Sequence, residues 1–161
     1  MNFFNANCQE PTINNKIFGL CDDGNNQKAY TDFDDSSKWI ATVKNNNEID
    51  LVFTAIDNCV IKNNEYLGRG RCDGMLTTTE HLYFIELKNV ARRWINNAIE
   101  QLESTIQFFL DNHDIDVYKH KKAFVCNKKH RPFQTVDNER NLRFFRKYGF
   151  RIDVQAEIII F

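Results

Sequence analysis

The sequence predicts an α/β protein in which a mixed β-sheet lies between helices. Runs of β-branched and aromatic residues separated by short polar turns fill residues 39–88, a pattern typical of consecutive strands. After residue 94 the hydrophobic period lengthens to that of a helix, and strand and helix patterns then alternate to the last residue. The chain has 161 residues, 42% of them hydrophobic and 14 of them Phe. We therefore expect one domain, residues 1–161, with its own core.

The first half of the chain predicts a poorly ordered start followed by a hairpin. Residues 1–37 are rich in Asn and Asp, so we expect a weakly structured N-terminal segment with one short helix near residues 13–20. Residues 39–43 and 49–56 have strand patterns. The three Asn residues at 45–47 lie between them and favour a turn.

A second hairpin is predicted from residues 66–77 and 82–88, with its turn at 78–80. An amphipathic helix of about five turns follows, carried by Trp94, Ile95, Ala98, Ile99, Leu102, Thr105, Ile106 and Phe109. Residues 122–126 predict a buried strand. A second helix begins at Asp137 or Asn138 and ends at Gly149, and residues 150–161 predict a closing strand.

The stretch RCDGMLTTTEHLYFIELKN, residues 71–89, carries the most specific chemistry. Side chains alternate along a strand, so Glu86 and Lys88 share one face while Leu87 points to the other. A tight turn at 78–80 places Asp73 opposite residues 84–87, beside Glu86. Two carboxylates and one amine therefore converge at one end of the hairpin.

A divalent cation suits this combination. Two neighbouring carboxylates repel each other, and one would otherwise take up a proton. Mg²⁺ prefers oxygen ligands and typically uses one or two carboxylates together with water and phosphate oxygens. A bound metal activates water and offsets charge in phosphodiester hydrolysis, and Lys88 can orient that water or stabilise developing charge.

Asp73, the Glu86-Leu87-Lys88 strand end and the helix that follows together resemble the core of the PD-(D/E)XK nuclease superfamily, in particular its RecB-like branch. The resemblance implies a restriction-endonuclease-like fold with a mixed β-sheet sandwiched by helices. It further implies catalytic roles for Asp73, Glu86, Lys88 and Gln101, and a metal ion, Mg²⁺ or Mn²⁺, held by Asp73, Glu86 and the Leu87 carbonyl.

The chain departs from the superfamily pattern in three respects. Cys72 stands where the name of the superfamily has proline. Thr105 stands where many members have an aromatic residue, one turn after the glutamine. Many members also supply an upstream acidic residue to the metal site; here the candidates, which the sequence does not rank, are Glu48, Asp50, Asp57 and Glu65.

Basic residues gather towards the C-terminal end. Residues 119–151 hold eleven Lys or Arg and two acids, a net charge of +9, although the whole chain carries −1. Such asymmetry favours an anionic partner. The candidate nucleic-acid contacts are Arg92, Arg93, Lys128, Lys129 and Arg131; a solvated basic face is the alternative.

The cysteines predict reduced thiols. Five cysteines, at positions 8, 21, 59, 72 and 126, form no CxxC pair, which fits a cytoplasmic protein better than a disulfide framework. No apolar run is long enough to span a membrane, and the first residues do not have the pattern of a secretory signal. We therefore expect a cytoplasmic location and no membrane partner.

The predicted function is a metal-dependent nuclease that hydrolyses phosphodiester bonds, with DNA expected ahead of RNA. The alternative is a non-catalytic protein of the same fold that binds a protein partner, such as an immunity protein that neutralises a toxin; a homodimer also stays open. For the site itself, the alternative is an ion pair at the end of the strand between Lys88 and Glu86 or Asp73. On an exposed edge, such a pair would contribute only about 0–1 kcal/mol to stability.

Overall fold

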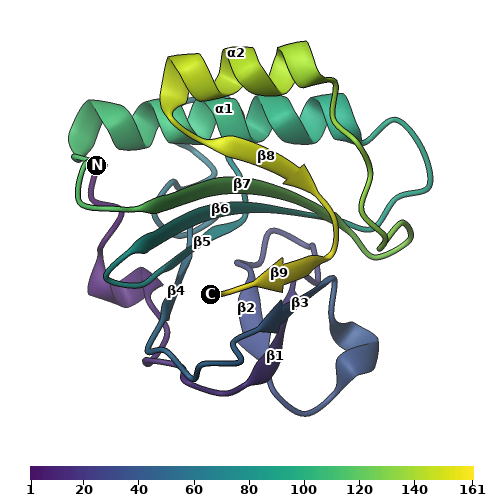
Figure 1. Cartoon of the computed structure of the whole chain (residues 1–161). Helices are drawn as coiled ribbons and strands as arrows, with labels where there is room; N and C mark the ends of the chain where they lie inside the picture. Colours follow the sequence, from purple (N-terminus) through teal and green to yellow (C-terminus); the bar gives the residue numbers. More distant parts are fainter.

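A computed structural model describes all of residues 1–161 and shows a mixed α/β fold of two mixed sheets and two helices (Figure 1). The larger sheet has the order β4-β5-β6-β7-β8, with strands β4 (Val52–Ala55), β5 (Gly74–Thr77), β6 (His81–Lys88), β7 (His120–Asn127) and β8 (Arg151–Val154). The smaller sheet has the order β2-β1-β3-β9, with strands β1 (Ile17–Cys21), β2 (Tyr30–Asp32), β3 (Ala41–Lys44) and β9 (Glu157–Ile159). The helices are α1 (Ile95–Asn112) and α2 (Asn138–Tyr148), and the short 3₁₀ turns are η1 (Ala6–Cys8) and η2 (Ser36–Lys38).

The hairpin of β5 and β6 has the predicted register. Gly74 pairs with Ile85 and Thr77 pairs with Leu82 in antiparallel fashion. On its other edge, β6 pairs with β7 in parallel along its whole length. All of β6 except Lys88 is buried, because layers of the protein cover both faces of the sheet, and this explains its nearly continuous apolar sequence.

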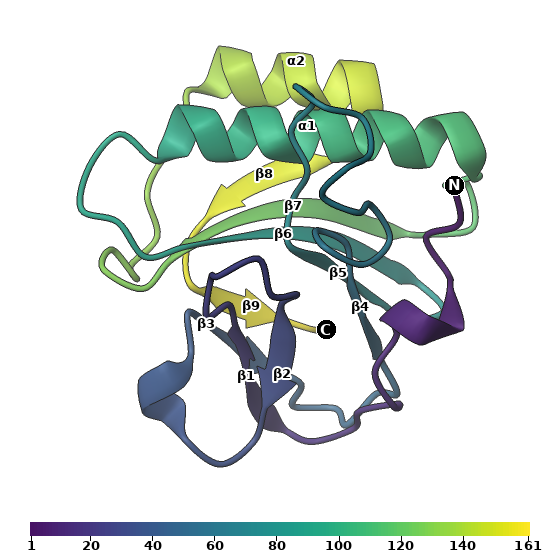
Figure 2. The same ribbon diagram turned by 180° about the vertical axis from the view of Figure 1, so that it is seen from behind.

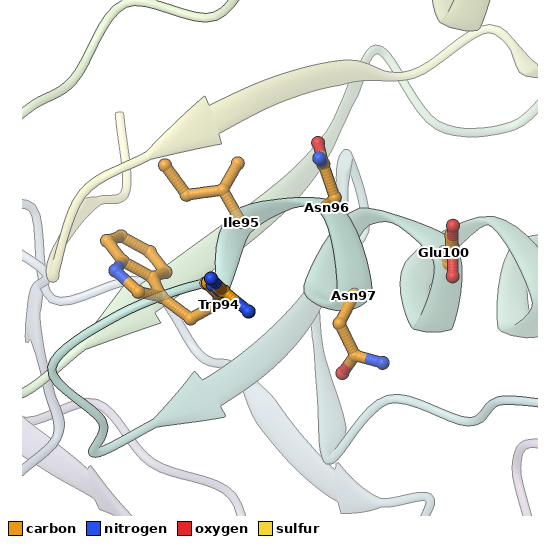
Figure 3. A pocket seen from close by; sticks show the side chains of 6 residues that line it. Trp94, Ile95, Asn96, Asn97 and Glu100 are labelled. Atoms are coloured by element: carbon orange, nitrogen blue, oxygen red, sulfur yellow. The ribbon is translucent and has the colours of Figure 1, made fainter.

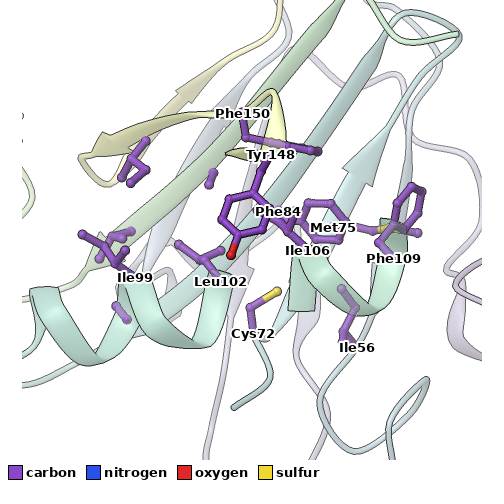
Figure 4. Packing of buried hydrophobic residues seen from close by; sticks show 14 of the residues in the cluster. Ile56, Cys72, Met75, Phe84, Ile99, Leu102, Ile106, Phe109, Tyr148 and Phe150 are labelled. Carbon is purple, nitrogen blue, oxygen red and sulfur yellow. The ribbon is translucent and has the colours of Figure 1, made fainter. Parts of the chain in front are cut away.

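Both predicted helices are present. Buried side chains of α1, including Leu102, Ile106 and Phe109, pack on Phe84 and Met75 of the sheet (Figure 4). The second helix ends at Gly149, whose left-handed backbone (φ +80°) suits glycine and lets its N–H bond to the Phe145 carbonyl.

The helices cover one face of the large sheet, whereas helices on both faces were expected (Figures 1 and 2). The order β6-α1-β7-α2-β8 moves across the sheet in a single direction. Two crossovers of the same hand and direction place their helices on the same side. The other face must therefore be covered differently.

The small sheet supplies that cover. Side chains such as Phe18, Leu20 and Val43 pack against Phe53 and Tyr83 of the large sheet in a second core. The segment 1–37, expected to be weakly structured, therefore contributes two strands. It also contributes Phe3, which is fully buried against the helix layer.

Two local expectations were wrong. Residues 13–20 form no helix, and β1 begins within them. The strands β3 and β4 do not form a hairpin, because they belong to different sheets. Buried Asn45 explains the change: its side chain bonds both the N–H (3.1 Å) and the carbonyl (2.8 Å) of Ile49, which ends β3 and turns the chain.

The closing strand is split in the same way. Residues 150–161 form β8 in the large sheet and β9 in the small one. At the crossing, Gln155 N–H bonds the Val125 carbonyl (3.0 Å), and the Ala156 carbonyl accepts from Thr42 N–H (2.8 Å). One segment thus joins the two sheets.

The expectation of reduced thiols fails for two cysteines. Cys8 and Cys59 form a disulfide, with 5.7 Å between their Cα atoms, while Cys21, Cys72 and Cys126 are free and buried. Disulfides persist mainly in oxidising compartments, so this pairing does not support the expected cytoplasmic location. Neither helix combines the length and the apolar composition needed to cross a membrane.

The disulfide gives a direct test of the N-terminal packing. It closes a loop with a sequence separation of 51, so Cys8→Ser should lower the free energy of unfolding by about 2–4 kcal/mol. Denaturant unfolding with and without dithiothreitol measures this. The variant should be insensitive to the reductant; equal loss of stability on reduction in wild type and variant would contradict the pairing.

Candidate active site

The site lies where β5 leaves β6. Their pairing runs to Gly74–Ile85, and Asp73 N–H adds one more bond to the Ile85 carbonyl (3.1 Å). Beyond that point Leu87 has no partner residue on β5. The Asp73 carboxylate takes this place, and its Oδ2 accepts from Leu87 N–H at 2.7 Å. This bond holds Asp73 against the end of β6, as predicted.

Lys88 connects the strand to the helix. Its ammonium lies 3.2 Å from Glu86 Oε1 and donates to Gln101 Oε1 (2.7 Å) and Asn97 Oδ1 (3.1 Å). The structure thus brings Glu86, Lys88 and Gln101 together. The Glu86 and Lys88 side chains are 3% and 19% exposed, so theirs is not the ion pair of an exposed edge.

Gln101 also fixes the loop before β5. Its Nε2 donates to the Arg71 carbonyl (3.3 Å) while its Oε1 accepts from Lys88. Gly70 passes close to it, and a Cβ at that position would lie 3.2 Å from the Gln101 Cα. The glutamine is therefore placed to orient the lysine.

Burial perturbs both carboxylates. Burial raises the pKa of Asp73 to about 8; Leu87 N–H opposes this shift, whereas the charges of Asp22 and Asp57 add to it. Burial also raises the pKa of Glu86 well above its usual value, Asp73 adds to the shift, and Lys88 only partly offsets it. Two buried acids with one amine leave excess negative charge when both are ionised.

These residues fit a divalent cation. Glu86 Oε2 is buried and has no hydrogen-bond partner, and an unpaired buried carboxylate oxygen is costly. The N–H and carbonyl of a strand residue point to the same edge, so the Leu87 carbonyl lies on the Asp73 side. No group of three or more His, Cys, Asp or Glu side chains is placed to hold a metal together, but Mg²⁺ commonly uses fewer and keeps several waters.

Of the four candidate upstream acids, only Asp57 affects the site. Its charge raises the pKa of both Asp73 and Glu86. It follows β4, its N–H bonds the Cys72 carbonyl (3.2 Å), and its carboxylate pairs with Arg71 Nε at 2.6 Å. Asp57 thus belongs to the electrostatics of the site and is held by an arginine.

Asn97 is a site neighbour that was not among the residues predicted from the sequence, whereas Thr105 occupies the accessory position named there. Asn97 lies four residues before Gln101 on the same helix face, a spacing that was available as a signal. Thr105, at the expected aromatic position, is buried; its hydroxyl accepts from Cys72 N–H (2.7 Å) and donates to the Gln101 carbonyl (2.9 Å). Thr105 thus joins the residue at the end of the β4–β5 loop, Cys72, to α1.

The five basic candidates divide into two groups. Lys128 bonds the Ser37 carbonyl (2.5 Å) and Arg131 bonds the Trp39 and Ile40 carbonyls (both 3.2 Å), so these two side chains join the small sheet to the β7–α2 connection. Arg92, Arg93 and Lys129 are exposed, as Arg131 is, but their side chains form no hydrogen bond or ion pair within the chain.

A surface pocket of about 690 Å³ adjoins the site at the start of α1 (Figure 3). Its lining consists of Arg93, Trp94, Ile95, Asn96, Asn97 and Glu100. In Figure 3, Asn97 points away from Ile95 and Asn96, and its amide oxygen is the one that accepts from Lys88. The pocket is therefore continuous with the candidate site through Asn97.

No protein-family model, curated protein or solved structure matches this chain.

The raised pKa of Glu86 predicts a pH-dependent gain in stability for Glu86→Gln without metal. A carboxylate with a raised folded-state pKa contributes its full stability below the unfolded pKa and loses it as the pH rises towards the folded pKa. Glutamine does not titrate, so in EDTA the variant should melt at least about 3 °C above wild type at pH 8, with a smaller difference at pH 5. Thermal melts across pH measure this.

Glu80→Gln is the matched control, because Glu80 is exposed and its ion pair with Lys119 lies away from the site. A wild type more stable than Glu86→Gln at pH 8 would contradict the electrostatic account.

Proposed function

We propose that the protein is a metal-dependent nuclease of the PD-(D/E)XK type, with a restriction-endonuclease-like core, that hydrolyses phosphodiester bonds of DNA or RNA. One observation carries the proposal: Asp73, Glu86, Lys88 and Gln101 come from three segments and meet in one partly buried site. Folding alone gives no reason to bury two carboxylates there, since apolar residues would serve the core better.

The residues have distinct roles in this proposal. Asp73, Glu86 and the Leu87 carbonyl would hold Mg²⁺ or Mn²⁺. When bound, such a metal lowers the pKa of water and offsets charge on the scissile phosphate. Lys88, already donating to Glu86 and Gln101, orients the attacking water or stabilises developing negative charge. Gln101 and Asn97 are positioning residues, because both act through the lysine ammonium.

In this proposal, substrate binding falls mainly to the basic side chains that are not bonded within the fold. Arg92 and Arg93 precede α1, Arg93 lines the pocket beside Asn97, and Lys129 follows β7. Lys or Arg contacts to phosphates give affinity without reading sequence. Arg131 and Lys128, bonded within the fold, contribute less to substrate binding than the sequence suggested.

The proposal predicts metal-dependent cleavage. Wild-type protein should cut at least one member of a labelled panel of DNA and RNA with Mg²⁺ or Mn²⁺ and none in EDTA. Glu86→Ala and Lys88→Ala should each lower the rate by at least about 100-fold, because each removes a group at the reacting atoms. Gel electrophoresis of the products measures this.

Glu80→Ala serves as the control and should cut like wild type. No cleavage of any substrate, together with no heat of metal binding in calorimetry, would reject the nuclease and leave a partner-binding protein, such as a toxin-neutralising immunity protein, as the explanation of the fold.

The division among the basic residues is also testable. Replacing Arg92, Arg93 and Lys129 together with Ala should lower the slope of log affinity against log salt by about 2–3, because each phosphate contact contributes about 0.9 on duplex DNA or 0.7 on single strands. Arg131→Ala should instead lower the melting temperature. Binding titrations at several salt concentrations and thermal melts distinguish the two; an unchanged slope in the triple variant would overturn the assignment.

A further inference from the structure

The loop between β4 and β5 presents apolar side chains to solvent beside the candidate site. Leu67 is 83% exposed and Tyr66 is 51% exposed. A leucine so fully exposed contributes little to folding stability, because almost none of its apolar surface is removed from water. Single exposed apolar residues are nevertheless common on protein surfaces. The location of this pair gives it significance.

The loop shares residues with the site. Its residues line a depression of about 250 Å³ together with Asp57 and Gln101. Gln101 bonds both Lys88 and the Arg71 carbonyl at the end of the loop. In Figure 2 the loop lies across α1. A chain reaching Lys88 from this side therefore passes Tyr66 and Leu67.

Side-chain contacts hold the loop in one conformation. Arg71 bonds the Lys62 carbonyl (2.9 Å), the Asn63 amide oxygen (2.7 Å) and the Asp57 carboxylate (2.6 Å). These bonds hold the loop so that Tyr66 and Leu67, its apolar tip, are exposed to solvent.

Phe108 of α1 supports the tip from below. The Arg69 guanidinium lies 3.8 Å from the centre of the Phe108 ring, and the Tyr66 ring lies 4.9 Å from it, edge to face. Tyr66 and Gly68 both have left-handed backbones, with φ of +49° and +81°, and such a conformation is unfavourable for tyrosine. A strained, supported turn that leaves an aromatic and a leucine exposed is organised for contact with a ligand.

The chemistry of this tip matches an unstacked nucleobase. A base offers a flat apolar face that stacks on aromatic side chains whatever its sequence, and leucine is among the residues that insert between bases. Arg69, beside the pair, adds positive charge for the phosphate backbone. In a duplex those faces are covered by neighbouring bases, whereas a single strand exposes them.

We propose that Tyr66 and Leu67 bind an exposed base of single-stranded nucleic acid and that the substrate of the adjoining site is a single strand or an unpaired strand end. Base binding by Tyr66 and Leu67 does not depend on the proposed nuclease function; only the identity of the substrate rests on it. Tyr66 stacks on the base, Leu67 lies against its neighbour, and the backbone continues past Gln101 towards Lys88.

The test measures binding without cleavage. In the Glu86→Gln background with EDTA, fluorescence anisotropy compares a labelled single strand with a blunt duplex of the same sequence, and 2-aminopurine in the strand reports stacking. The single strand should bind at least about tenfold tighter. Leu67→Ser and Tyr66→Leu should each weaken it by about tenfold and reduce the 2-aminopurine signal change, with little effect on duplex binding.

Val117→Ser is the matched control: Val117 is 69% exposed and follows the C-terminal end of α1. Thermal melts check that each variant is folded, and Tyr66→Leu retains an apolar contact with Phe108. The proposal would be overturned if the Leu67 and Tyr66 variants bound the single strand as tightly as the control does. Tighter binding of the blunt duplex than of the single strand would overturn it too.

The outcomes separate the two proposals. Loop-dependent binding of single strands by a wild type that cuts nothing would keep the base-binding surface and reject the nuclease. Metal-dependent cleavage that needs Lys88 but ignores Tyr66 and Leu67 would keep the nuclease and reject this inference.

Discussion

The hydrogen bond from Leu87 N–H to the Asp73 carboxylate (2.7 Å) determines the geometry of the site. It forms where β5 has left β6, so a side chain completes a ladder that backbone groups no longer can. The bond brings Asp73 to Glu86 and leaves the edge of β6 open on that side. Gln101 and Thr105 of α1 then bond the end of the departing loop, at the Arg71 carbonyl and Cys72 N–H, which keeps the opening in place.

Ionising the two buried carboxylates of this site costs electrostatic free energy. Burial raises the pKa of both carboxylates, the Asp73 charge raises that of Glu86 further, and Asp57 adds to both shifts. Lys88 is the nearest positive charge and must serve Glu86, Gln101 and Asn97 at once. Such unbalanced charge is typical of functional sites, where a ligand supplies what the folded chain lacks. The core on either side is apolar and gives the site a rigid frame.

The N-terminal third stabilises that frame. Consecutive crossovers place α1 and α2 on one face, and the small sheet covers the other. The disulfide joins η1 to Cys59, two residues after Asp57, so the segment expected to be weakly structured is bonded close to Asp57. Arg131 adds a second connection by bonding the Trp39 and Ile40 carbonyls beside β3. The position of the site thus depends on contacts between distant parts of the chain.

The elements whose signals are local could be predicted from the amino-acid sequence. The apolar period of α1, the Gly149 end of α2 and the short turn before β6 gave the right helices and the right hairpin register. That register placed Asp73 beside Glu86. Three other features became apparent only in the folded chain: Asn45 directs β3 and β4 to different sheets, both helices share a face, and Cys8 bonds Cys59 across a sequence separation of 51. Those outcomes depend on which buried faces pair with each other, a property of the whole chain that no local period or turn encodes.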